Sequence, residues 1–224
     1  APRDAHAFRI RGCAYRTLGV EESLRGKDPR PTWKLAVDDL DEAIRLAPRS
    51  ADAWGDRGVV RQKLAEWMAS HGQDPGETLA LGERDLSKAL DLDPSNSAVL
   101  VNRGSILLER SERESAAGTD PLPTLEKALA DLSEAVRLDP RQAQALNNRG
   151  LVHFNVGLRA VSRGADPVDS FRKALAEFDA ALAAEPGFVF PLNNQGLVGR
   201  RLGEWQAGHG ADPREAWDAA LAAL

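Results

Sequence analysis

The stretch Gln144–Pro186 reads QALNNRGLVHFNVGLRAVSRGADPVDSFRKALAEFDAALAAEP, and its landmarks recur along the whole chain. Its first glycine belongs to the series Gly12, Gly58, Gly104, Gly150 and Gly196, which has a constant step of 46 residues. The pair Asp166-Pro167 and the closing Pro186 recur with the same step, without an insertion or a deletion. A period between 20 and 50 residues is typical of a solenoid, in which one supersecondary unit stacks on the next.

We therefore predict a single repeat domain over residues 1–224. Its repeats are 5–50, 51–96, 97–142, 143–188 and a truncated 189–224, and residues 1–4 align with the tail of a preceding repeat. The truncated last repeat ends in an apolar segment, whereas the terminal repeats of solenoids are usually polar. This pattern favours a fragment of a longer protein.

Each repeat reads as two helices. The first helices are predicted at Asp4–Arg25, Ala51–Ser70, Ser97–Ala117, Ala143–Arg163 and Pro191–Gly208. The second are predicted at Pro29–Leu46, Pro75–Leu92, Pro121–Leu138, Pro167–Ala184 and Pro213–Leu224. A glycine just past each first helix suits a left-handed C′ position, and each Asp-Pro pair is expected to cap a second helix with proline at its first helical residue. Apolar residues recur at helical spacing and no strand-like alternation is present, so the predicted fold class is all-α.

The segments Ala143–Gly150 and Ala174–Ala181, with Pro186, Trp54 and Gly58, resemble the tetratricopeptide repeat (TPR) family. The resemblance covers all five repeats and implies a right-handed α-solenoid of helix-turn-helix repeats that binds proteins or peptides. TPR repeats have about 34 residues, so each repeat here has a surplus of about 12. We expect the surplus to lengthen the first helix and to add turns before the second. The apolar layer for these turns is expected from Trp33, Leu79, Leu125, Phe171 and Trp217, with Trp67 and Trp205 near the ends of two first helices.

The composition argues against several classes of function. The net charge is −5, which disfavours nucleic-acid and anionic-membrane partners, because both need a basic face. The single cysteine, Cys13, permits no internal disulfide, and His71 and His209 share one repeat position too far apart to bind one metal ion. No catalytic or phosphate-binding motif is present, so we expect no enzyme activity, no cofactor and no metal. The abundance of arginine and alanine is typical of GC-rich bacterial coding, and the absence of a signal peptide and of an apolar span favours a cytoplasmic location.

An arginine precedes the first glycine in repeats one to four, and an acid follows 28 residues later. We predict ion pairs that tie the first helix of each repeat to its second, partly buried and structural in role. The predicted pairs are Arg11 with Asp39, Arg57 with Asp85, Arg103 with Asp131, and Arg149 with Glu177.

Asparagines give the main functional hypothesis. Asn102, Asn148 and Asn194 recur at 46 residues, and Asn147 and Asn193 stand beside two of them. The resemblance to TPR proteins implies that this position faces a concave groove, where an amide can pair with a peptide backbone through both a donor and an acceptor. A second interpretation is that these asparagines bond to the neighbouring helix. Phe154 and Arg200 are further predicted contacts for an apolar anchor and an acidic residue of a bound peptide.

Protein–protein interaction through the concave groove is therefore the predicted function. Two alternatives stay open at this stage. The array could serve an adjoining domain of the same polypeptide, as a regulatory or scaffold segment of a larger bacterial kinase or protease. It could also assemble end to end through exposed apolar helix faces.

Overall fold

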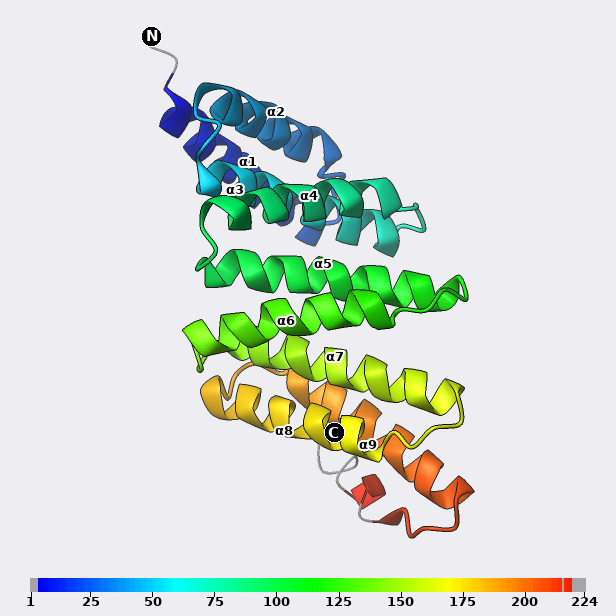
Figure 1. Cartoon of the computed structure of the whole chain (residues 1–224). Helices are drawn as coiled ribbons and strands as arrows, with labels where there is room; N and C mark the ends of the chain where they lie inside the picture. The colour runs from blue at the N-terminus through cyan, green and yellow to red at the C-terminus, as the bar shows by residue number, and fades with distance from the viewer. Residues whose placement is uncertain (1–3, 215, 219–224) are drawn as a thin grey trace. The chain divides into compact units, whose positions relative to one another are not determined.

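The computed structural model describes residues 4–214 and 216–218. Within these residues it contains nine α-helices and no β-strand (Figure 1). The helices are α1 Ala5–Leu24, α2 Arg30–Leu46, α3 Ala51–Ser70, α4 Gly76–Leu92, α5 Ser97–Ala116, α6 Leu122–Leu138, α7 Ala143–Ser162, α8 Val168–Ala184 and α9 Phe190–Gly208. The predicted helix Pro213–Leu224 lies mostly outside the described residues, and 214 and 216–218 within it are helical.

Helix boundaries repeat with the period of the sequence. The first helices α1, α3, α5 and α7 each have 20 residues, and the second helices α2, α4, α6 and α8 each have 17. Predicted and observed ends agree within one or two residues. The first helices are therefore about 30 Å long, at 1.5 Å per residue.

One detail of the second helices differs from the prediction. Each proline is the N-cap residue and not the first helical residue, as the Trp33 N–H shows by bonding to the Pro29 carbonyl at 2.9 Å. The preceding aspartate caps the next free donor, since Asp28 Oδ1 accepts from the Arg30 N–H at 3.0 Å. Proline fits the cap because its fixed φ matches the observed −84° and its missing N–H removes one unpaired donor.

The glycine after each first helix takes the predicted left-handed conformation. Its φ lies at 72° in Gly26 and at 69° in Gly164, and three further glycines share it. The Lys27 N–H bonds to the Glu22 carbonyl at 2.9 Å and the Gly26 N–H bonds to the Ser23 carbonyl at 3.0 Å. This is the Schellman arrangement, which satisfies the last carbonyls of the helix and turns the chain toward the next one.

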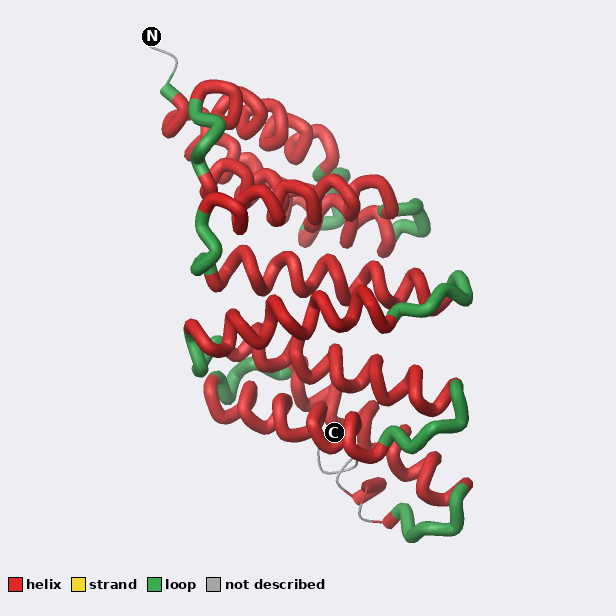
Figure 2. Tube along the Cα trace, viewed as in Figure 1, coloured by secondary structure: helices red, strands yellow, loops and turns green. Residues whose placement is uncertain are grey.

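The chain divides into two compact parts within α5. The N-terminal half runs to Ile106 and the C-terminal half starts at Leu107. In the N-terminal half α1 packs on α2 and α3, and α3 packs on α2 and α4. In the C-terminal half α7 packs on α6, α8 and α9, and α8 packs on α9. Short loops join the consecutive helices, as Figure 2 shows.

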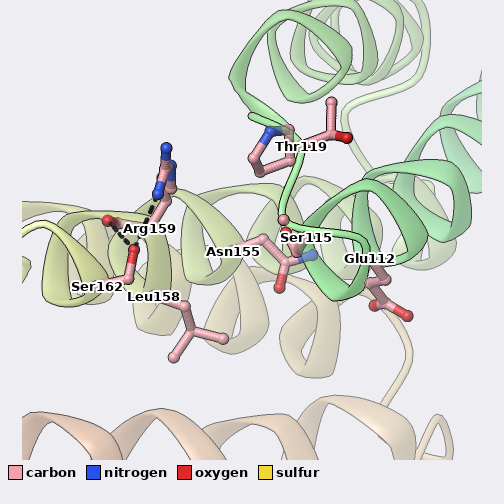
Figure 3. A pocket seen from close by; sticks show the side chains of 9 residues that line it. Glu112, Ser115, Thr119, Asn155, Leu158, Arg159 and Ser162 are labelled. Atoms are coloured by element: carbon pink, nitrogen blue, oxygen red, sulfur yellow. Dashed lines mark hydrogen bonds between the residues drawn. The ribbon is translucent and has the colours of Figure 1, made fainter.

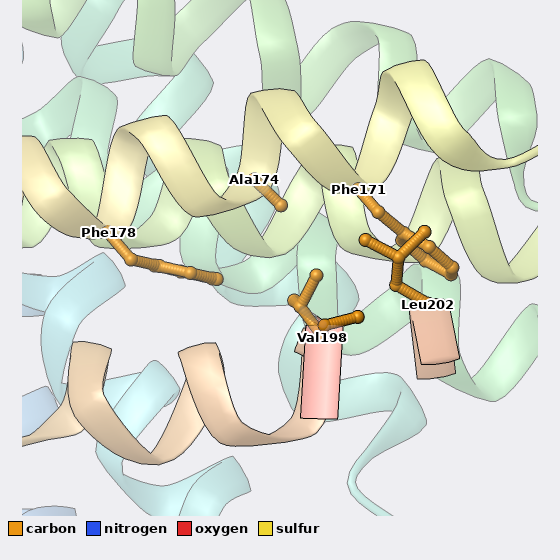
Figure 4. Packing of buried hydrophobic residues seen from close by; sticks show 6 residues of the cluster. Phe171, Ala174, Phe178, Val198 and Leu202 are labelled. Carbon is orange, nitrogen blue, oxygen red and sulfur yellow. The ribbon is translucent and has the colours of Figure 1, made fainter. Parts of the chain in front are cut away.

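The core of each half is built from the predicted apolar stripe of the second helices. In α8, Phe171, Ala174 and Phe178 are fully buried and pack with Val198 and Leu202 of α9 (Figure 4). In α2, Trp33, Ala36 and Leu40 are buried in the same way and pack with Val60 of α3. The residues that begin the second helices therefore supply the apolar layer expected for the added turns.

Glycines of the first helices let these large side chains approach. A Cβ built on Gly150 would lie 2.5 Å from the ring of Phe178, and one on Gly157 would lie 2.4 Å from the ring of Phe171. Both distances are far below ordinary contact, so the backbone of α7 is in direct contact with aromatic rings of α8.

Candidate interaction surface

Three of the four predicted arginine–acid pairs have both residues in the same half of the chain, and each of these three is present in the structure. Arg11 donates to both oxygens of Asp39 at 2.6 Å, and Arg57 donates to Asp85 at 2.6 and 2.9 Å. Arg149 lies 2.7 Å from Glu177. The fourth pair joins residues of the two halves and stays a prediction. Each of these contacts joins the two helices of one repeat, and the structural role of the series stays a prediction.

The same arginine position also reaches the preceding repeat, which the sequence reading missed. Arg57 contacts Asp41 of α2 as well as Asp85 of α4, and Arg61 also donates to Asp85 at 2.5 Å. Gln195 donates to Asp179 of α8 at 2.6 Å, with the same spacing along the chain. The sequence contains a signal for these contacts between repeats, because the two acceptors, Asp41 and Asp179, occupy the same repeat position.

The asparagines are largely engaged within the protein. Asn147 and Asn148 of α7 are buried, with exposed fractions of 5% and 8%. Asn194 of α9 donates to Asn147 Oδ1 at 2.9 Å, so this contact joins two neighbouring first helices. Asn193 is exposed and Asn102 is half-buried. Bonding to the neighbouring helix is therefore observed for Asn147 and Asn194, and the peptide-binding role of the asparagine series stays a prediction.

An equivalent contact occurs in the N-terminal half with different chemistry. Arg9 of α1 donates to Asp56 of α3 at 2.9 Å, and Arg16 lies 3.5 Å from the same carboxylate. Burial raises the pKa of Cys13 to about 11, and hydrogen bonding to the Asp56 carboxylate adds to the rise. Neighbouring first helices are thus joined side chain to side chain in both halves.

Phe154 and Arg200 differ in their surroundings. Phe154 is half-buried and packs on Phe171, with ring centroids 5.7 Å apart, so its main contacts belong to the core. Arg200 is exposed on α9 beside Glu204, at 3.9 Å. Leu197, one turn earlier, is 43% exposed.

These exposed residues form a stripe along α9. Phe190 is 62% exposed, and Asn193, Leu197 and Arg200 follow at steps of three or four residues, which places them on one face of the helix. We call Phe190, Asn193, Leu197 and Arg200 the α9 stripe. It combines two apolar side chains, an amide and a cation, a composition suited to contacting a protein segment.

Two cavities lie between the far ends of neighbouring first helices. The larger, of about 380 Å³, lies in the C-terminal half between α5 and α7 (Figure 3). The smaller, of about 260 Å³, lies in the N-terminal half between α1 and α3. Several wall residues correspond at a shift of two repeats, and Glu112 and Arg159 of the first stand where Val20 and Trp67 of the second stand. The lengthened helices build both.

Two tryptophans near the ends of first helices each stack on a histidine four residues later. Trp67 stacks on His71 with centroids 4.0 Å apart, and Trp205 stacks on His209 at 3.8 Å. In each case the histidine Nδ1 lies 2.8 Å from the tryptophan carbonyl oxygen. Arg30 covers the Trp67 ring at 4.8 Å, so this ring has contacts within the protein, consistent with a packing role.

Other chemistry is sparse in the described part of the chain. Residues 4–214 and 216–218 contain no group of three histidine, cysteine or acidic side chains that could hold a metal ion. None of the helices described is both long enough and apolar enough to cross a membrane.

Comparison with known proteins agrees with this architecture. Residues 124–157, which run from α6 into α7, match the family described as TPR repeat. This segment of the chain is similar to a tetratricopeptide repeat. The match has the usual length of such a repeat, so the additional residues of the period lie after Gly157, in the end of α7, the loop and the start of α8. Among curated proteins none matches the sequence.

Several solved structures have a similar fold over nearly the whole of this chain. A crystal structure of MamA protein is 16% identical, with a TM-score of 0.58 over 95% of this chain and 91% of that one. PilF of Pseudomonas aeruginosa is 21% identical, with a TM-score of 0.59 over 98% and 78%. YrrB, described as a TPR protein with an unusual peptide-binding site, is 18% identical, with a TM-score of 0.55 over 94% and 84%. The all-α solenoid of helix-turn-helix repeats is therefore the fold of this chain.

Proposed function

We propose that this chain is an interaction module that binds an extended segment of a protein partner on its first helices, and that the α9 stripe is the main contact surface in the C-terminal half. The observation that carries the proposal is the exposure of Phe190 and Leu197 in line with Asn193 and Arg200. An exposed apolar patch with polar neighbours marks an interaction site more often than an ordinary surface does.

The contacts and exposure of the asparagines favour Asn193 as the one that binds a ligand. Asn147 and Asn194 already bond to each other, so a peptide would have to compete with that contact. Asn193 is exposed and its amide offers a donor and an acceptor to a peptide backbone. Leu197 would hold an apolar side chain and Arg200 an acidic one. The likeness to YrrB, whose description names a peptide-binding site, supports the general mode.

The source of the bound segment is left to experiment. A separate partner and an adjoining domain of the same polypeptide would use the same stripe. A second copy of the chain would make the apparent mass depend on concentration, which light scattering measures directly.

The test is affinity capture from a GC-rich bacterial lysate with three baits. The first is the unchanged chain, and the second carries Leu197→Ser and Arg200→Ala. The matched control carries Leu35→Ser and Lys34→Ala on α2, where leucine is 48% exposed and the cation also pairs with an acid four residues later. We expect a protein retained by the first and third baits and lost by the second. Equal retention by all three baits would refute the α9 stripe as the contact surface.

A further inference from the structure

The cavity between the ends of α5 and α7 is lined by polar side chains from both helices and from the loop that follows α5. Glu112 and Ser115 come from α5, Thr119 from the loop, and Asn155 and Arg159 from α7. Figure 3 shows Arg159 and Ser162 on one side of the pocket and Glu112 on the other, with Asn155 and Ser115 between them. In the N-terminal cavity the positions of Glu112 and Arg159 are taken by Val20 and Trp67. Glu112 and Arg159 are therefore particular to this cavity, whereas the N-terminal cavity has Lys63 and Glu66 in its lining.

Arg159 is held in a fixed orientation with one terminal nitrogen, Nη2, to spare. Its Nε donates to Asp120 at 3.1 Å and its Nη1 donates to Ser162 at 3.2 Å. Within the described part of the chain, Nη2 of Arg159 has no hydrogen-bond partner. Arg163 also pairs with Asp120, at 2.8 Å, so two guanidinium groups share one carboxylate and leave a local charge of +1. A planar guanidinium that is already positioned binds a carboxylate with little loss of side-chain entropy.

Glu112 supplies an acceptor on the opposite wall. Desolvation raises the pKa of Glu112, and a hydrogen bond with the Asn155 amide opposes part of the rise. A carboxyl group that has lost part of its hydration gains from a new N–H donor more than a solvated one does. Leu158 and Pro121 add apolar surface to the lining.

We propose that this pocket binds an acidic residue of a protein segment, with the side-chain carboxylate on Arg159 and a backbone N–H on Glu112. The proposal rests on the proposed function only for the source of the segment. A volume of about 380 Å³ is within the range of small-ligand pockets and admits one side chain with its flanking peptide groups. The free Nη2 of Arg159 offers a ligand carboxylate a charge-assisted hydrogen bond.

The test is a titration of the ¹⁵N-labelled chain with N-acetyl-glutamate amide, followed by amide chemical shifts. N-acetyl-glutamine amide is the matched probe without charge. We expect saturable shifts confined to residues 112–121 and 155–162, with an affinity at least tenfold higher for the acidic probe. The N-terminal cavity, at Ser23 and Ser70, is the internal control and should not respond.

Variants separate the two recognition elements. Arg159→Gln should reduce the affinity for the acidic probe to that for the neutral one, whereas Arg172→Gln, which removes an exposed cation from α8, should leave it unchanged. Glu112→Ala should weaken both probes several-fold, because both offer the same N–H groups. This variant also keeps the test informative if Arg159→Gln impairs folding, as judged by circular dichroism.

Three results would overturn the proposal: equal affinity for the two probes, shifts that persist in Arg159→Gln, or shifts of equal size in the N-terminal cavity. A negative titration together with lysate capture that depends on Leu197 and Arg200 would refute this pocket and leave the proposed function standing. The reverse outcome would refute the α9 stripe and retain the pocket.

Discussion

Replacing Gly157 with alanine would place a methyl group against the ring of Phe171, which is fully buried. A Cβ on residue 157 would lie 2.4 Å from Cε1 and 2.5 Å from Cδ1 of that ring. Carbon atoms in good contact are about 3.5–4.0 Å apart, so the ring or the helix must move by about 1 Å. The perturbation tests directly how closely the lengthened helices α7 and α8 pack against each other.

The expected magnitude follows from two opposing effects. Overpacking a core costs about 1–3 kcal/mol, and a fully buried ring with no free side belongs near the upper value. Alanine is a better helix former than glycine by about 1 kcal/mol. We therefore expect Gly157→Ala to lower the free energy of unfolding by about 1–2 kcal/mol.

The chain itself contains the compensating change. In repeat two, Leu79 stands at the position of Phe171 and Ala65 at the position of Gly157, and both are buried. Phe171→Leu alone should cost about 1–2 kcal/mol through the space it leaves. Combined with Gly157→Ala it reproduces the repeat-two pair, so the double variant should be more stable than the sum of the single changes by about 1–2 kcal/mol.

The assay is urea unfolding of the four chains, followed by far-ultraviolet circular dichroism. Gly208→Ala is the control, because a Cβ on this helical glycine meets nothing within 4 Å and should be neutral or slightly stabilising. Single changes that add within about 0.5 kcal/mol would refute the close contact. An unchanged stability of Gly157→Ala would refute it as well.

Three further predictions concern charged and titratable groups. Asp85→Asn should lower the free energy of unfolding by about 3–5 kcal/mol in a urea titration. The substitution removes the charge of a side chain that is 1% exposed and leaves the guanidinium groups of Arg57 and Arg61 without their shared carboxylate. Asp39→Asn should do less harm, since its arginine partner is 58% exposed. Burial lowers the pKa of His153 in the folded chain. The stability that the neutral side chain contributes above about pH 6.5 is therefore lost as the pH falls through the folded-state pKa. His153→Gln should reduce the acid sensitivity of the urea midpoint. With a pKa of about 11, the Cys13 thiol should react with iodoacetamide at pH 8 at least ten times more slowly in the folded chain than in urea, and Asp56→Asn should speed the reaction.

Each of these has a contrary result. Equal losses from Asp85→Asn and Asp39→Asn would mean that burial does not decide the strength of these pairs. An unchanged pH profile in His153→Gln would assign the acid sensitivity to other groups. Equal alkylation rates in the folded and unfolded chains would place the Cys13 thiol in water.

Much of the fold could be predicted because its determinants are local. A glycine with positive φ after each first helix and an Asp-Pro pair before each second helix are decided by backbone sterics and by the first free N–H groups, which the sequence states directly. The arginine–acid pairs could be predicted because both partners recur with one period and vanish together in repeat five. The proline was misplaced by one residue because the N-cap and first helical positions both tolerate a missing N–H.

The interaction surface was harder to predict because it depends on contacts between repeats. Asn147 and Asn194 are 47 residues apart, one more than the repeat period. They therefore occupy different repeat positions, and the asparagine series with its step of 46 residues does not indicate their contact. Phe154 looks like a groove residue by its place in the helix, yet the large ring of Phe171 in the same repeat draws it into the core. The cavities follow from the length of the first helices, which the period revealed, but their linings depend on which residues of two neighbouring repeats meet.

The constant helix boundaries have a consequence for how such a chain can change its length. Every repeat in which both helices lie within the described residues enters through a helix of 20 residues, turns at the same glycine and leaves through a helix of 17 residues. Unequal recombination between any two repeats would therefore restore the same junctions, and an excision such as residues 51–96 would join Ser50 to Ser97 with the capping geometry intact. Only the surfaces that face a changed neighbour would be new, so the array can gain or lose binding positions while keeping its backbone register.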